Sequence, residues 1–251
     1  MERKVVMITG ASSGIGQATA RVFAEKGCSL ILGARRVERI EKLCNELEKE
    51  CKIQAVAVFM DVRNYAELEK TMNSLPEELR KVDVLVNSAG LSLGAGKAQD
   101  ADLQNFDTMF DVNVKGVYNM TRLILPGMVE RNSGHIINIG SIAGLAAYST
   151  GSAYCASKAA VKTFTEATRL DVHGSDIRVT LVEPGMTSTE FMAVKFGEVK
   201  DYYSGVECLL PENVADIVLY CAMCPPNVNI TELVVWPTHQ AAATQVYRRN
   251  Q

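Results

Sequence analysis

The chain has 251 residues, and its 47% apolar and 22% charged residues are close to the averages of globular proteins. These proportions exclude wholesale disorder, collagen and coiled coil. The net charge of −3 favours neither nucleic acid nor an anionic membrane surface as a partner. No apolar stretch approaches the ~20 residues of a membrane span, and the apolar run near the N-terminus is too short for a signal peptide. The sequence therefore predicts a cytoplasmic protein.

Short apolar runs rich in Val, Ile and Leu alternate with longer helical patterns along the chain. The runs are continuously apolar, which is typical of strands covered on both faces, so they predict a parallel sheet built from right-handed βαβ units. No repeat, low-complexity tract or linker divides residues 1–251, so one domain is expected. The expected strands are Val5–Thr9, Ser29–Gly33, Ala55–Met60, Val84–Asn87, His135–Gly140, Arg178–Val182 and Leu233–Trp236. The helical patterns lie near residues 15–26, 37–50, 64–74, 103–130, 152–173 and 211–223.

A glycine-rich turn with Gly10, Gly14 and Gly16 joins the first strand to the first helix. A chain that turns from strand to helix beside a pyrophosphate needs residues without a Cβ atom, and the helix N-terminus then offers free N–H groups. A plain tight turn would also explain three glycines. Their position at the first strand–helix junction favours pyrophosphate binding.

The second strand ends at Ala34, Arg35 and Arg36. NAD-dependent enzymes commonly place an acid here for the adenosine ribose, and such an acid would repel a 2′-phosphate. Arginine, in contrast, is suited to bidentate phosphate recognition. In the alternative interpretation, both arginines only solvate the start of the next helix. The missing acid and the two arginines together favour NADP over NAD.

Tyr154 and Lys158 are four residues apart at the start of a predicted helix, so their side chains share one face. A nearby ammonium favours the phenolate and lowers the tyrosine pKa, which suits proton transfer at a carbonyl or alcohol oxygen. Such pairs are also common on exposed helices. Three earlier polar residues support the catalytic interpretation, namely Asn87 at the end of the fourth strand, Asn113, and Ser141 just after a strand.

Two segments near the C-terminus do not fit the strand–helix rhythm. Residues 186–210 form a long connection after a strand, which predicts a substrate lid, and residues 237–251 form a tail. An acidic substrate would need a cation, and Lys195 in the lid or Arg248 or Arg249 in the tail are candidates. Solvated surface charge is the more common state of any single one of them.

Seven cysteines at irregular spacings fit reduced thiols better than a disulfide framework. Cys221 and Cys224 match the C-x-x-C pattern, but a zinc site would want a second pair or nearby histidines. Residues 214–223 are apolar and helix-like, so buried thiols and no metal site are expected.

At these motifs the sequence resembles the short-chain dehydrogenase/reductase family, in the family's order and over essentially the whole chain. The resemblance implies an α/β fold, a single-domain Rossmann-type doubly wound parallel sheet of about seven strands, with a nicotinamide cofactor. It implies that Tyr154 is the proton donor or acceptor and that Lys158 lowers its pKa and holds the nicotinamide ribose. Ser141 would hydrogen-bond the substrate oxygen, and Asn113 would anchor a water of the proton relay. A homotetramer is implied, with a dimer as the alternative.

The resemblance also implies the set of residues that touch the cofactor. Asp61 matches the adenine contact, and the segment from Pro184 matches the one that binds the carboxamide and phosphates. Ser88 stands where the family usually has asparagine, for which a modest effect on the turn is expected. The expected cofactor contacts are Gly10, Ser12, Ser13, Gly14, Ile15, Gly16, Arg35, Arg36, Asp61, Val62, Asn87, Ala89, Gly90, Tyr154, Lys158, Pro184, Gly185, Thr187 and Thr189.

Within the family, the chain is similar to the NADP-dependent 3-hydroxy acid dehydrogenases and sulfoacetaldehyde reductases. The similar segments include Ala34–Arg39, Leu125–Arg131, His135–Gly144 and Thr189–Phe191. The similarity implies hydride transfer between NADP and a small polar 3-hydroxy acid, such as serine or allo-threonine, or a short aldehyde or ketone. Residues 147–152 depart from the subgroup and should border the substrate. A broader carbonyl or 3-oxoacyl reductase and a non-catalytic NADP-sensing protein are the alternatives.

Overall fold

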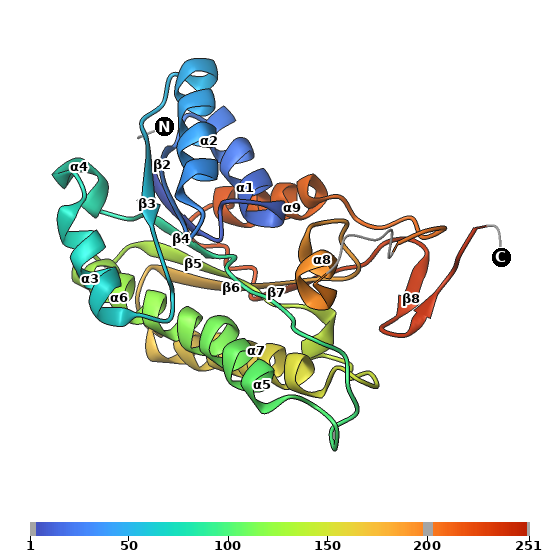
Figure 1. Ribbon diagram of the computed structural model, residues 1–251. Helices are drawn as coiled ribbons and strands as arrows, with labels where there is room; N and C mark the ends of the chain where they lie inside the picture. The colour runs from blue at the N-terminus through green and yellow to red at the C-terminus, as the bar shows by residue number, and fades with distance from the viewer. Residues whose placement is uncertain (1–3, 198–202, 250–251) are drawn as a thin grey trace.

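A seven-stranded parallel sheet forms the centre of the computed structural model, which describes residues 4–197 and 203–249 (Figure 1). The strand order is β3-β2-β1-β4-β5-β6-β7, so the predicted doubly wound sheet is confirmed. The predicted strand ends differ from the observed ones by at most two residues. The strands are β1 (Val5–Thr9), β2 (Ser29–Ala34), β3 (Ala55–Phe59), β4 (Val84–Asn87), β5 (Gly134–Ile139), β6 (Ile177–Pro184) and β7 (Glu232–Val235).

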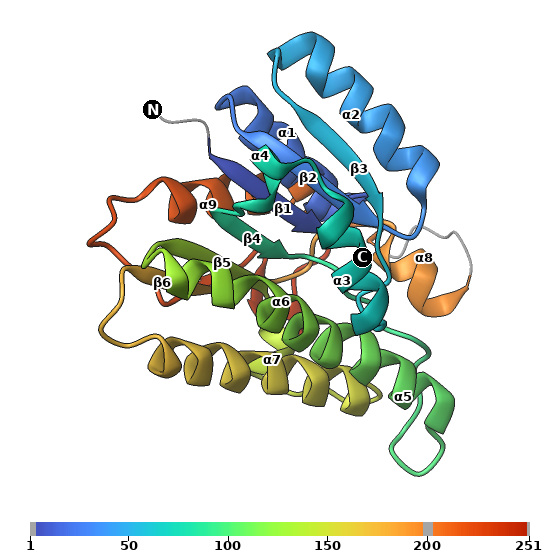
Figure 2. The same cartoon turned by 90° about the vertical axis from the view of Figure 1, so that its left-hand side faces the viewer.

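Helices cover both faces of the sheet (Figure 2). Helices α1, α2 and α9 pack on one face; α6 and α7 pack on the other, where α3 contacts α6 and α5 contacts α7. The helices are α1 (Gly14–Glu25), α2 (Val37–Cys51), α3 (Tyr65–Ser74), α4 (Glu77–Arg80), α5 (Leu103–Phe110), α6 (Gly116–Glu130), α7 (Ser152–Asp171), α8 (Phe191–Phe196) and α9 (Pro211–Met223). No described helix is long and apolar enough to cross a membrane.

The continuous apolar runs become strands because each strand contributes side chains to two cores. Val6 and Ile8 of β1 belong to the core beneath α1, α2 and α9. Val5 and Met7, which point the opposite way, belong to the core on the other face. All residues of β1 are buried, as the absence of alternation in the sequence predicted.

Several elements were not expected from the sequence. The pattern near 103–130 contains a π-helical turn at Asp111–Lys115, which separates α5 from α6. The short helix α4 and the lid helix α8 were also missed, as was a small hairpin in the tail, β8 (Gln240–Ala242) with β9 (Gln245–Val246). These elements are too short to show a hydrophobic period.

The carboxyl ends of the strands position the candidate site. Strand β1 lies between β2 and β4, so the chain leaves the sheet in opposite directions on either side of β1 and opens a crevice there. Helix α8 and the tail hairpin lie beyond this end of the sheet (Figure 1). The predicted lid residues 186–197 and 203–210 lie within the described part of the chain.

Candidate functional site

A cavity of about 720 Å³ opens at the carboxyl ends of the strands. Its wall combines the turns after β1, β2, β4 and β5 with the lid and the tail. All predicted site residues except Gly16, Asn87 and Asn113 line it. Lid and tail residues also do so, as do Tyr148 and Ser149 from the divergent segment 147–152. The sequence motifs therefore meet in one site.

The glycine turn has a shape that only glycine permits. Gly10 has φ +69°, and a Cβ atom there would lie 2.8 Å from the Cα atom of Ala89. A Cβ atom on Gly16 would lie 2.6 Å from the Gly10 carbonyl oxygen, so Gly16 keeps α1 close to the turn without lining the cavity. No described side chain caps the first turn of α1, whose N–H groups face the site. The turn therefore fits a pyrophosphate.

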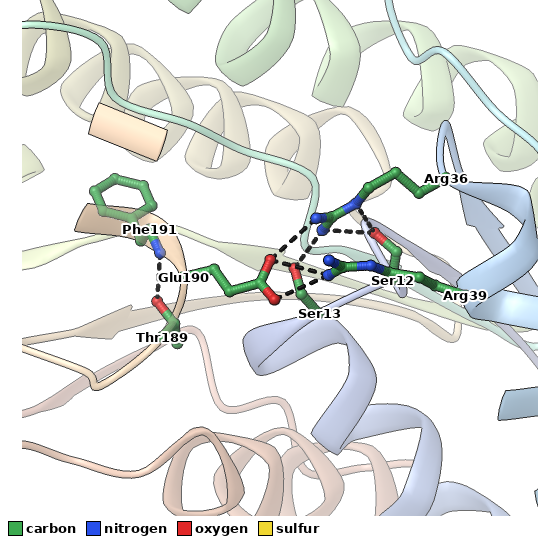
Figure 3. Close-up of polar contacts among 7 residues, drawn as sticks. All are labelled: Ser12, Ser13, Arg36, Arg39, Thr189, Glu190 and Phe191. Atoms are coloured by element: carbon green, nitrogen blue, oxygen red, sulfur yellow. Dashed lines mark hydrogen bonds and ion pairs between the residues drawn. The ribbon is translucent and has the colours of Figure 1, made fainter. Parts of the chain in front are cut away.

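An arginine cluster lies beside the glycine turn (Figure 3). The Arg36 guanidinium donates hydrogen bonds to the Ser13 hydroxyl at 2.8 Å and to the Ser12 hydroxyl at 3.1 Å. The Glu190 carboxylate of the lid accepts hydrogen bonds from Arg36 at 3.0 Å and from Arg39 at 2.9 Å. Burial alone would raise the pKa of Glu190, but the hydrogen bonds from the two arginines lower it below its usual value. The cluster supplies cations at this end of the cavity, and arginine is suited to bind a phosphate there.

Arg35 and Asp61 complete this end of the cavity. Both line the cavity, and no hydrogen bond or ion pair of the Arg35 side chain is found among the described residues. Arg63 donates to the Asp61 carboxylate at 2.6 Å, and this hydrogen bond lowers the pKa of Asp61. Asp61 therefore presents a carboxylate acceptor on the cavity wall, which suits the predicted adenine contact.

Tyr154, Ser141 and Lys158 lie together at the opposite end of the cavity. The Tyr154 side chain is buried and hydrogen-bonded with Ser141, whose hydroxyl also accepts the Ala143 N–H at 3.1 Å. The Lys158 ammonium lies 5.9 Å from the centre of the Tyr154 ring and donates to the Ile139 carbonyl at 2.9 Å. The predicted helical pair is therefore assembled with the predicted serine.

Burial dominates the titration of this pair. It raises the pKa of Tyr154 above its usual value, although the hydrogen bond with Ser141 opposes the shift. This direction is opposite to the one expected from the lysine alone. Burial lowers the pKa of Lys158 to about 8, and the nearby Glu183 carboxylate opposes that change. A buried, protonated Tyr154 is suited to donate a proton.

Asn113 lies outside the cavity wall, in the π-helical turn. Its side chain accepts the Leu91 N–H at 2.8 Å and donates to the Leu91 carbonyl at 2.8 Å and to the Ser157 hydroxyl at 3.0 Å. A Cβ atom on Gly90 would lie 3.4 Å from Asn113 and 3.5 Å from the Lys158 ammonium. Asn113 therefore fixes the loop after β4 next to the predicted lysine.

Asn87 supports the site from below. Its amide donates to the Asn138 side chain at 2.8 Å, and both residues are buried in the sheet. The Thr9 hydroxyl accepts the N–H groups of Ser88 at 3.1 Å and Ala89 at 3.0 Å. The hydrogen bonds to Thr9 come from the backbone, so serine at position 88 leaves them possible.

The lid and the tail contribute contacts that the sequence did not reveal. The Gln240 side chain accepts the Met186 N–H at 2.9 Å, which joins the tail to the start of the lid. Gln240 and Glu190 were missed because each is a single polar residue outside any motif of known chemistry. Phe191, the first residue of α8, packs edge-on against Tyr154 with ring centres 5.5 Å apart. In the described ranges, no three His, Cys, Asp or Glu side chains gather as metal ligands would.

Glu183 is a buried acid beneath the site. It is fully buried at the end of β6, and burial raises its pKa, as does the carboxylate of Glu232. A pKa above the unfolded value means that Glu183 binds its proton more tightly when folded. Its contribution to stability is therefore complete below the unfolded pKa of ~4.3 and is lost as pH rises through the folded pKa.

The variant Glu183→Gln cannot ionise and should lose less stability than the wild type as the pH rises from 5 to 9. The difference in slope is expected to reach at most ~1.4 kcal/mol per pH unit. Thermal melts of both proteins without cofactor at several pH values measure it. Glu69→Gln, at an exposed position of α3 whose charge does not contribute to the Glu183 shift, is the control and should keep the wild-type slope. Identical slopes for all three proteins would contradict the assignment.

Comparison with known proteins places these features in context. Residues 4–199 match the short chain dehydrogenase family. The chain is 42% identical to an NADP-dependent 3-hydroxy acid dehydrogenase of Escherichia coli (strain K12), over 98% of this chain and 100% of that protein. It is 43% identical to sulfoacetaldehyde reductase 2 of Chromohalobacter salexigens, over 94% and 95%. It superposes on the closed form of serine dehydrogenase complexed with NADP⁺ with a TM-score of 0.90 and 42% identity, covering 98% and 99%.

Proposed function

Because the chain belongs to the short-chain dehydrogenase family, we propose that it transfers a hydride between NADP and a small polar 3-hydroxy acid or the corresponding aldehyde or ketone. The chain is an NADP-dependent dehydrogenase acting on hydroxyl groups. Serine, 3-hydroxypropionate and sulfoacetaldehyde are within the proposed substrate class, in keeping with the names of the relatives. The observation that carries the proposal is the placement of Tyr154, Ser141 and Lys158 in the cavity that begins at the glycine turn.

The chain's own residues hold the two ends of the cofactor. The N-terminus of α1 and the turn at Gly10 would bind the pyrophosphate, and Arg35 and Arg36 would hold the 2′-phosphate. Lys158 would hold the nicotinamide ribose. When bound, NADP supplies the hydride for reduction or accepts it in oxidation.

Proton transfer is the task of the buried tyrosine. In the direction of reduction, Tyr154 donates its phenolic proton to the carbonyl oxygen, which also accepts a hydrogen bond from Ser141. The Lys158 ammonium then lies near the developing phenolate and stabilises it. In oxidation, Tyr154 takes the hydroxyl proton. Asn113 positions the loop after β4 and holds the relay water that the family resemblance implies.

The remaining parts of the proposal concern the surroundings of the site. Residues 186–210 act as the substrate lid, with the tail residue Gln240 as an anchor. A homotetramer is supported by exposed apolar side chains such as Leu103 and Leu170, which are 80% and 77% exposed. A cytoplasmic location is supported by seven free cysteines.

A substrate panel tests the proposed function. Purified protein with NADP⁺ is expected to oxidise 3-hydroxy acids, and with NADPH to reduce short semialdehydes, at rates measured by nicotinamide absorbance. NAD⁺ should support much slower turnover, because it lacks the 2′-phosphate that the arginine cluster would bind. Preference for bulky or uncharged carbonyls would favour the broader carbonyl reductase. Cofactor binding without any turnover would favour an NADP-sensing protein.

A further inference from the structure

The short lid helix α8 presents two side chains to the reacting end of the cavity. Phe191 and Lys195 are four residues apart and therefore lie on one face of the helix, about 6 Å apart along its axis. The Phe191 ring contacts Tyr154, and both Phe191 and Lys195 line the cavity. Lys195 is thus one helical turn from a residue in contact with the proposed proton donor.

Lys195 is a cation in a partly dehydrated position. Its ammonium lies 5.7 Å from the Tyr148 ring centre and 5.2 Å from the Phe196 ring centre, and burial lowers its pKa. No ion pair of Lys195 with an acid is found in the described part of the chain. Its carbonyl accepts the Gly94 N–H at 2.9 Å, which holds the end of α8 against the loop after β4.

The other candidate cations are engaged elsewhere. Arg248 donates to the Ser204 carbonyl at 2.7 Å, and Arg249 forms an ion pair with Glu207 at 2.9 Å. Neither tail arginine lines the cavity. Arg36 and Arg39 pair with Glu190 at the cofactor's far end. Of the cations predicted to meet an acidic substrate, only Lys195 reaches the cavity in the described ranges.

We propose that the Lys195 ammonium binds the acid group of the substrate, a carboxylate or sulfonate separated from the reacting carbon by one carbon atom. This inference rests on the proposed function and names the residue that selects anionic substrates. With the hydroxyl held by Tyr154 and Ser141, the acid group of so short a molecule points toward α8. Tyr148 borders the same subsite, because its ring lies beneath the ammonium.

The variant Lys195→Met tests the assignment. Its kcat/KM for 3-hydroxypropionate is expected to fall about 20-fold, mainly through KM, because a charge-assisted contact is lost. Its kcat/KM for the uncharged 3-hydroxypropanamide should change less than about twofold. Lys195→Arg should restore most of the activity on the acid. If the natural head group is a sulfonate, the kcat/KM for isethionate should fall in Lys195→Met in the same way. The acid that the wild type turns over better, the carboxylate or the sulfonate, identifies the natural head group.

The tail variant Arg248→Gln is the matched control and should keep the wild-type ratio of acid to amide turnover. An unchanged ratio in Lys195→Met would overturn the inference while leaving the proposed function intact. A wild type that acts only on uncharged carbonyls would overturn the proposed function instead. Inhibition by malonate then decides about Lys195: weaker inhibition of Lys195→Met supports the anion subsite, and equal inhibition excludes it.

Discussion

Replacing Tyr154 by phenylalanine is expected to lower kcat by about 10²–10⁴-fold, the usual contribution of a positioned general acid or base. The change removes only the hydroxyl that is hydrogen-bonded with Ser141. The ring keeps its contact with Phe191, so the shape of the buried site is preserved. The Kd of NADPH should stay within about threefold of the wild type, because the glycine turn and the arginine cluster are untouched.

Steady-state rates and a fluorescence titration with NADPH measure the two quantities separately. Tyr118→Phe is the matched control, since Tyr118 is a half-exposed tyrosine of α6 that does not line the cavity. That variant should keep kcat within about threefold. Wild-type rates in Tyr154→Phe, or an equal loss of kcat in both variants, would contradict the assignment of Tyr154 as the proton donor or acceptor.

The sheet could be predicted from the sequence because its strands are buried on both faces. Continuous apolar runs such as β1 and β4 carry that pattern in their composition. The π-helical turn at Asp111–Lys115 could not be predicted, because one extra residue in a turn leaves the apolar pattern nearly unchanged. Helix α8 could not be predicted either, because its six residues are too few to show a hydrophobic period.

The candidate site could be predicted where chemistry fixes both residue type and position. Gly10 follows a strand and cannot carry a side chain, and Tyr154 and Lys158 are linked by helical spacing. The direction of the Tyr154 pKa shift could not be predicted, because it depends on burial by residues distant in sequence. The contacts of Glu190 with Arg39 and Arg36 could not be predicted either, because they join residues 151 and 154 positions apart in the sequence.

The lid segment connects the two ends of the cavity. Glu190 pairs with the arginines (Figure 3). Its neighbour Phe191 packs on Tyr154. An ion pair with arginines about half exposed is worth little by itself, so a 2′-phosphate can share or replace it. Arg36 therefore contacts the lid and, in the proposed function, also holds the 2′-phosphate, and only the second role depends on that phosphate.

Replacing Arg36 by alanine is expected to raise the Kd of NADPH about 100-fold, because a charge-assisted contact to the 2′-phosphate is lost. The Kd of NADH should rise less than about threefold. Loosening of the lid alone would weaken both cofactors equally, since Glu190 loses the same partner in either case. Titrations with NADPH and NADH distinguish the two causes.

Two further arginine variants complete this test of NADP recognition. Arg35→Ala should also weaken NADPH binding far more than NADH binding, because Arg35 lines the same end of the cavity. Arg21→Ala is the matched control: it breaks an ion pair with Glu46 between α1 and α2, away from the cavity. That variant should bind both cofactors like the wild type. Equal losses for NADPH and NADH in Arg35→Ala and Arg36→Ala would mean that these arginines organise the lid and do not select NADP.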